Sequence, residues 1–163
     1  MTPEGLAAVV LRSETCCVVK QCAGAGCKLR LPSSGKHACI CGTCYQRNHG
    51  HTEPLCDCIL FWTSQHDVVA IVELKTTVKA EECLRQLRNG AAVAELRTPK
   101  NITPHDIVPL IVHGSMNSAV VVKLAGKTVK YRGKEYLIRR IKCGADLETA
   151  MRRRVFPNKR RSR

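Results

Sequence analysis

Aromatic residues and long apolar runs are both scarce in this chain of 163 residues. Aromatics make up 4% of the sequence, with one Trp, three Tyr and two Phe. The core must therefore be built from Val, Leu, Ile and Ala, and few rings remain on which nucleic-acid bases could stack. The apolar run AVVVKLAG at 119–126 is interrupted by Lys123 and is far shorter than the roughly 20 residues of a membrane span. We therefore predict a protein without a membrane partner.

Acidic residues are also few, because 13 Asp and Glu stand against 27 Lys and Arg, a net charge of +14 at neutral pH. Such a charge on a chain of this length favours a polyanionic partner, which we take to be nucleic acid. The first fourteen residues include Glu4 and no basic segment, so they predict no secretory signal. We expect a cytoplasmic protein.

The order of predicted elements indicates one mixed α/β domain over residues 1–151. Thr2 and Pro3 are typical of a helix start. A region rich in Cys, Gly and His follows at 16–54, and then a hairpin at 56–77. Apolar residues spaced three and four apart at 80–94 predict an amphipathic helix, and HDIVPLIVHG at 105–114 predicts a buried strand. Further β structure includes a hairpin that turns at Arg132–Gly133, and a tail at 152–163 carries seven Arg or Lys. The tail either contacts phosphates or only solubilises the chain.

The hairpin CDCILFWTSQHDVVAIVELKTT, residues 56–77, carries three charges that a buried element should not tolerate unless they are paired or bind a metal. Residues two apart on a strand share a face, so Glu73 and Lys75 project together. If the chain reverses over 63–67, Asp57 lies opposite residues 73–75. Two carboxylates and one ammonium on one face are suited to holding Mg²⁺ and hydrolysing a phosphodiester. The alternative is a solvated charged face with a weak Glu73–Lys75 pair.

Asp57, fifteen intervening residues and then Glu73-Leu74-Lys75, on a hairpin followed by an amphipathic helix, resemble the PD-(D/E)xK nuclease superfamily. This superfamily includes restriction endonucleases, archaeal Holliday-junction resolvases and RecB-type nucleases. The resemblance covers residues 55–113 and implies a restriction-endonuclease-like mixed sheet flanked by helices, with the Cys-rich region as an insertion. By this likeness Asp57 and Glu73 ligate Mg²⁺ or Mn²⁺ with help from the Leu74 carbonyl, and Lys75 serves catalysis. A homodimer is expected by the same likeness.

The resemblance also implies an acid from the first helix and assigns a role to a Gln on the helix after the motif. Gln86 stands at the place where RecB-type members carry a Gln. The acid is Glu4 or Glu14, and we favour Glu14 because Glu4 is explained as a partner of the helix dipole. The chain departs from the pattern at Cys56, where the superfamily name has Pro.

Cysteine is abundant, with eleven residues, nine of them at 16–58. In a reducing cytosol such clustering favours a metal site over disulfides. We predict that Cys22, Cys27, Cys41 and Cys44 bind Zn²⁺, with His49 and His51 as alternate ligands. An iron–sulfur cluster, disulfides and free thiols are the other interpretations. Cys56, Cys58 and Cys83 are predicted to be apolar core residues.

The sequence therefore predicts a Mg²⁺-dependent endonuclease acting on nucleic acid, with DNA favoured. The alternative is a zinc-stabilised nucleic-acid-binding protein without catalysis, in which Asp57, Glu73 and Lys75 coincide by chance.

Overall fold

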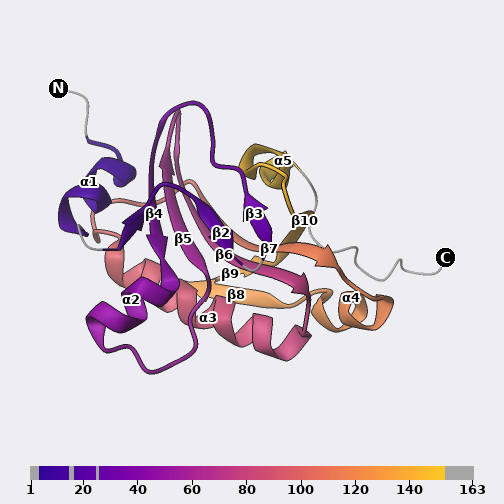
Figure 1. The fold of residues 1–163 in the computed structure, drawn as a ribbon. Coiled ribbons are helices and arrows are strands. Elements are labelled where there is room, and N and C mark those ends of the chain that lie inside the picture. The colour runs from indigo at the N-terminus through magenta and orange to yellow at the C-terminus, as the bar shows by residue number, and fades with distance from the viewer. Residues whose placement is uncertain (1–3, 15–16, 25, 153–163) are drawn as a thin grey trace.

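The computed structural model describes residues 4–14, 17–24 and 26–152 (Figure 1). The elements, in chain order, are α1 (Leu6–Ser13), β1 (Val18–Val19), β2 (Cys22–Gly24), β3 (Cys27–Leu29), β4 (Lys36–Cys41), α2 (Gly42–His49), β5 (Cys58–Thr63), β6 (Asp67–Thr77), α3 (Ala80–Arg97), β7 (Asp106–Ser115), α4 (Ser118–Leu124), β8 (Thr128–Tyr131), β9 (Lys134–Leu137), β10 (Arg139–Lys142) and α5 (Leu147–Arg152).

A mixed six-stranded sheet in the order β1-β4-β5-β6-β7-β10 forms the centre of the fold. Strands β1, β4, β5 and β6 pair antiparallel, whereas β6, β7 and β10 are parallel. Two small antiparallel ladders, β2–β3 and β8–β9, lie outside this sheet. The predicted mixed α/β sheet flanked by helices is confirmed.

The two faces of the sheet bury different layers. Ile59, Phe61 and Ile71 belong to a core that includes residues of α1, α3 and β8. Leu60 and Val72, which alternate with them, belong to a second core that includes residues of β2, β3 and α5. Figure 1 shows α3 along one face of the sheet and β3 with α5 toward the other. The alternation arises because successive side chains of a strand point to opposite faces.

The β5–β6 hairpin has the predicted register. Cys58 pairs with Val72 and Thr63 with Asp67, so the chain reverses over residues 63–67. The Thr63 hydroxyl donates a 2.6 Å hydrogen bond to Asp67 Oδ1, which joins the two ends of the turn. This register places the residue before β5 beside the residue after Val72.

Helix α3 connects the parallel strands β6 and β7 and packs closely on the sheet. Its buried residues Cys83, Leu87, Ala91 and Ala94 recur every three or four positions, as predicted. Gly90 lies where α3 approaches Cys56 so closely that a Cβ atom there would be 2.4 Å from Cys56 Sγ. The glycine is therefore required by packing, although it weakens the helix intrinsically.

Other predicted elements differ in detail. Helix α1 begins at Leu6, with Gly5 as its N-cap, and the predicted start at Thr2 and Pro3 lies outside the described residues. The turn at Arg132–Gly133 is confirmed, with φ of 48° and 77°. The residues after that hairpin form β10, which pairs in parallel with β7. The Cys-rich region contributes β4 to the main sheet. No helix among the described residues is long and apolar enough to cross a membrane.

Candidate active site

Asp57 lies at the point where the chain enters β5, directly beside β6. Its Oδ2 atom accepts a 2.7 Å hydrogen bond from the backbone N–H of Leu74. The carboxylate of Asp57 is thereby held against the Glu73–Lys75 segment, as the hairpin spacing predicted. The Leu74 side chain is buried on the other face of the sheet, and the predicted role of its carbonyl in binding metal stays a prediction.

Glu73 is a fully buried acid, with 0% of the residue exposed. Neither of its carboxylate oxygens has a hydrogen-bond partner among the described residues. Burial raises the pKa of Glu73 to about 10, and the adjacent Asp57 carboxylate adds to the rise while Lys75 opposes it. A buried carboxylate without hydrogen bonds is costly unless a cation binds it.

Lys75 supplies one positive charge at this point. Its Nζ atom lies 3.5 Å from Glu73 Oε1 and 3.8 Å from Oε1 of Glu82, in the first turn of α3. Burial lowers the pKa of Lys75, but the carboxylates of Glu73, Asp57 and Glu82 raise it by more. Lys75 is therefore cationic at neutral pH. One ammonium thus lies among three carboxyl groups, and the raised pKa of Glu73 keeps that acid protonated at neutral pH while no metal is bound.

Gln86 lies near this group, and Glu14 does not. Gln86 Nε2 donates a 3.5 Å hydrogen bond to the carbonyl of Leu55, just before Asp57, and its Oε1 is buried with no hydrogen-bond partner in the described part of the chain. Because Gln86 follows Glu82 by four residues, both lie on one face of α3.

The structure places Glu14 in a different cluster, so it does not supply the first-helix acid. Its Oε1 lies 3.2 Å from His49 Nε2, and its Oε2 lies 3.5 Å from Arg97 Nη1. Arg97 lies eleven residues beyond Gln86 in α3, about 16 Å of helix rise. Glu4, the other candidate from the N-terminal region, forms an exposed ion pair with Arg12. Glu82 is the third carboxylate that meets Lys75.

His113, like Glu82, is a residue near Lys75 that the sequence analysis missed. It lies on β7, in register with Lys75 of β6 on one side and with Lys142 of β10 on the other. The three side chains therefore share one face of the sheet. The residue is 5% exposed, and its Nδ1 has no hydrogen-bond partner within residues 4–14, 17–24 and 26–152. Burial, and then the charges of Lys142 and Arg140, lower the pKa of His113, so the ring is neutral at pH 7. Alternation along β7 puts His113 on the face of Ile107 and Ile111, but the residues of β6 and β10 beside it depend on the parallel register, which the sequence does not show.

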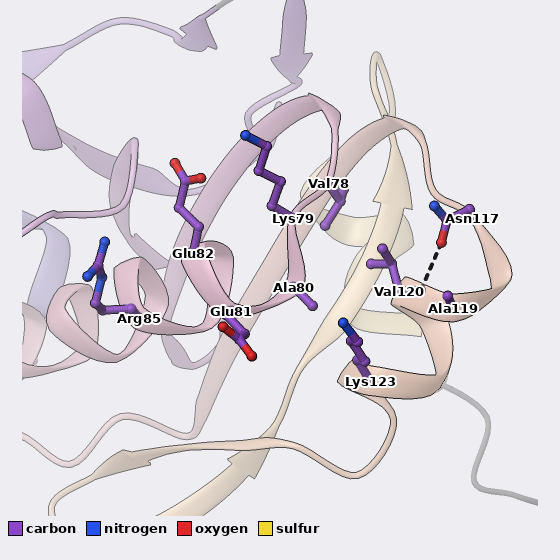
Figure 2. A pocket seen from close by; sticks show the side chains of 10 residues that line it. All are labelled: Val78, Lys79, Ala80, Glu81, Glu82, Arg85, Asn117, Ala119, Val120 and Lys123. Carbon is purple, nitrogen blue, oxygen red and sulfur yellow. Dashed lines mark hydrogen bonds between the residues drawn. The ribbon is translucent and has the colours of Figure 1, made fainter.

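A cavity of about 760 Å³ opens between the start of α3 and α4, next to this group of residues (Figure 2). Glu82 lines the cavity and also lies beside Lys75, so the cavity adjoins the group formed by Asp57, Glu73 and Lys75. Figure 2 shows Lys123 and Glu81 extending toward the space between the two helices. Three cationic side chains line the cavity: Lys79, Arg85 and Lys123. Glu81 and Glu82 line the same cavity, so its lining carries three basic and two acidic side chains.

The cysteines do not form the predicted zinc site. Cys22 is disulfide-bonded to Cys58, and Cys27 to Cys143. Cys22 and Cys27 belong to the core on the β2–β3 face, whereas Cys44 packs against the other core. The prediction that Cys22, Cys27, Cys41 and Cys44 converge is therefore wrong, because the sheet separates Cys44 from the first two.

Two other groups of side chains have the composition and proximity to hold a metal ion. The sulfur atoms of Cys22, Cys39 and Cys58 lie within 4.8 Å of one another, and so do ligand atoms of Glu14, Cys17 and His49. Cys56 and Cys83 are buried core residues, as predicted, and burial raises the pKa of Cys83 to about 11.

Comparison of the chain with protein-family models, curated proteins and solved structures finds no match.

Proposed function

We propose that the protein is a metal-dependent nuclease that hydrolyses phosphodiester bonds, with DNA as the favoured substrate. The observation that carries this proposal is Glu73, a fully buried carboxylate with no hydrogen bond to either oxygen from the described residues, next to Asp57. Each of these two carboxylates disfavours the charged form of the other, and Lys75 offsets this only in part, because the pKa of Glu73 stays raised. A cation between them removes that penalty.

The donor set fits a hard divalent ion. Carboxylate oxygens are the ligands that Mg²⁺ and Mn²⁺ prefer, and a site with one or two carboxylates leaves positions for water and phosphate. When bound, such an ion polarises a phosphoryl oxygen and lowers the pKa of a coordinated water molecule. Asp57 and Glu73 would hold the ion, and the hydrogen bond from Leu74 N–H fixes the orientation of the Asp57 carboxylate.

Lys75 and its neighbours would act on the substrate. The ammonium is held by Glu73 and Glu82, so it is positioned to offset charge that develops on a phosphoryl oxygen. His113 lies beside Lys75, and its Nδ1 has no hydrogen-bond partner among the residues that the structure describes, which suits a hydrogen bond to a phosphate. The net charge of +14 favours a polyanionic partner, and three of the five charged side chains that line the adjacent cavity are cationic.

The arrangement of elements supports the PD-(D/E)xK type of nuclease. Asp57 precedes β5, Glu73 and Lys75 lie on β6, and α3 then leads to the parallel strand β7. This is the hairpin, helix and strand order on which the resemblance rests.

Cleavage assays test the proposal directly. Plasmid, branched DNA and RNA are incubated with wild-type protein in Mg²⁺ or Mn²⁺, and in EDTA. Asp57→Asn and Glu73→Gln should abolish metal-dependent cleavage while nucleic-acid binding is retained. Glu135→Gln, an exposed position on β9, serves as the matched carboxylate control and should cleave like wild type. Wild-type rates from both site variants would refute the assignment.

A second candidate function is a zinc-stabilised nucleic-acid-binding protein without catalysis. The close sulfur atoms of Cys22, Cys39 and Cys58 favour it. Under this function the wild-type protein binds nucleic acid, and Mg²⁺ and EDTA give the same intact substrate.

A further inference from the structure

Three cysteine sulfur atoms meet on the β2–β3 face of the sheet. Cys22 comes from β2, Cys39 from β4 and Cys58 from β5, and their sulfur atoms lie within 4.8 Å of one another. All three residues are buried, with exposed fractions of 0%, 0% and 3%. Cys22 and Cys58 are joined as a disulfide, and the thiol of Cys39 lies against that bond. Strands from separate parts of the chain thus bring three sulfurs to one point.

Cys41 lies near them on the same face, although its sulfur is not one of the three that lie within 4.8 Å of one another. It follows Cys39 by two residues on β4, so both side chains project from the same face. Cys41 is also the cross-strand partner of Cys58, and side chains of such a pair have Cβ atoms about 5 Å apart. Burial chiefly raises the pKa of Cys39, and the nearby Cys41 adds to the rise, which is consistent with their proximity. Cys41 is partly exposed, which gives an ion a route from solvent.

We propose that Cys22, Cys39, Cys41 and Cys58 form a tetrathiolate Zn²⁺ site in the reduced protein, and that the Cys22–Cys58 disulfide is the metal-free, oxidised form of the same cluster. Four thiolates around Zn²⁺ at about 2.3 Å place neighbouring sulfurs about 3.8 Å apart. The three close sulfurs therefore need little movement, and rotation of the Cys41 side chain supplies the fourth. The set differs from the spacing-based prediction by replacing Cys27 and Cys44 with Cys39 and Cys58.

The two forms are related by balanced chemistry. A dithiol reductant breaks the Cys22–Cys58 bond, gives each sulfur a hydrogen and is itself oxidised to a disulfide. Zn²⁺ then binds the four thiols and displaces their four protons. Reoxidation by a disulfide-type oxidant removes two electrons from the Cys22 and Cys58 thiolates, restores their bond and releases the ion.

The site is independent of the proposed nuclease activity, and its consequence is structural. It would connect β2 to the neighbouring strands β4 and β5, near the end of β5 where Asp57 enters the strand. Metal binding energy at such a site contributes directly to folding free energy. Reduced, zinc-loaded protein should therefore unfold at a higher temperature than reduced protein treated with a chelator.

Metal analysis and cobalt substitution of the full chain, purified anaerobically with reductant, test the proposal. Wild-type protein should contain one equivalent of Zn²⁺, and Co²⁺ in its place should show the absorption bands of tetrahedral thiolate coordination. Cys39→Ser and Cys41→Ser should lose these bands or shift them to three-sulfur coordination. Oxidation should release the ion and yield the Cys22–Cys58 disulfide in a peptide map.

The controls separate this site from the alternatives. Cys44→Ser changes a partly exposed cysteine three residues from Cys41 that packs against the opposite core, so it should retain the full cobalt spectrum. Cys27→Ser, on the same face as the cluster, should retain it too. If Cys39→Ser fails to fold, the partly exposed Cys41→Ser decides. Absence of thiolate bands in reduced wild type, or their survival in Cys41→Ser with loss in Cys44→Ser, would overturn the proposal.

Discussion

Replacing Glu73 by Gln should stabilise the metal-free protein, and the gain should grow with pH. The pKa of Glu73 is raised from 4.5 to about 10, so the folded protein keeps this proton at pH 7 while the unfolded chain releases it. Unfolding therefore releases a proton, and rising pH favours unfolding from about pH 4.5 upward. Gln keeps the shape of the protonated acid but carries no proton to lose.

The size of the effect follows from the pKa difference. Each unit between the unfolded pKa and the working pH costs about 1.4 kcal/mol, so the wild type gives up about 3 kcal/mol at pH 7. For a chain of this size that corresponds to roughly 6–12 °C in melting temperature. The two proteins should unfold at nearly the same temperature at pH 4.5–5, and the difference should widen by about 1.4 kcal/mol per pH unit.

Thermal and urea unfolding in non-reducing buffer with EDTA, at pH 5, 6, 7 and 8, measure this. Glu82→Gln is the matched control, because Glu82 also pairs with Lys75 but its side chain is 44% exposed. An exposed pair is worth about 1 kcal/mol or less, so this variant should change little and show no added pH slope. In the same buffer without EDTA, Mn²⁺ should raise the melting temperature of wild type and leave that of Glu73→Gln unchanged. A Glu73→Gln protein no more stable than wild type at pH 7 would refute the reasoning.

Three further outcomes are expected. Lys75→Ala should abolish cleavage but retain Mn²⁺ binding, measured by calorimetry, since the carboxylates remain; loss of metal binding would contradict this. Gly90→Ala should lower the free energy of unfolding by about 1–3 kcal/mol despite its better helix propensity, because its Cβ would lie 2.4 Å from Cys56 Sγ. Urea titration checks it, and a stabilised variant would rule out the close approach. Removing residues 153–163 deletes six cationic side chains, so DNA affinity should fall and its log–log dependence on salt should flatten; an unchanged slope means that the tail does not touch phosphate.

The group of Asp57, Glu73 and Lys75 could be predicted from the sequence, because local rules determine which residues of the hairpin lie together. Alternation along β6 places Glu73 and Lys75 on one face, and the turn at 63–67 sets which residue of the first arm lies opposite. Helix α3 was likewise predictable from the spacing of its buried residues. Each of these inferences needs only neighbours within about 20 residues.

Contacts between distant segments were not predictable in the same way. The pairing of Cys27 with Cys143 spans 116 residues, and many pairings of eleven cysteines satisfy the sequence equally. Glu14 met the requirement for an acid near the first helix, but the direction of α1 across the sheet brings it to His49 and Arg97 instead. His113 was missed because the register of β7 against β6 depends on the crossover through α3.

Helix α1 is held at its N-terminus by the far end of the hairpin. The Leu6 N–H donates to Asp67 Oδ1, 61 residues later, and the Ala7 N–H donates to the Thr63 hydroxyl. An eight-residue helix is too short to persist alone in water. During synthesis α1 leaves the ribosome long before its capping groups exist, so its helicity must wait for β5 and β6 to pair. Folding of α1 is therefore postponed until the nascent chain has delivered the hairpin tip. Asp67→Ala should slow the gain of α1 structure, and it should also weaken the turn, because the Thr63 hydroxyl loses its acceptor.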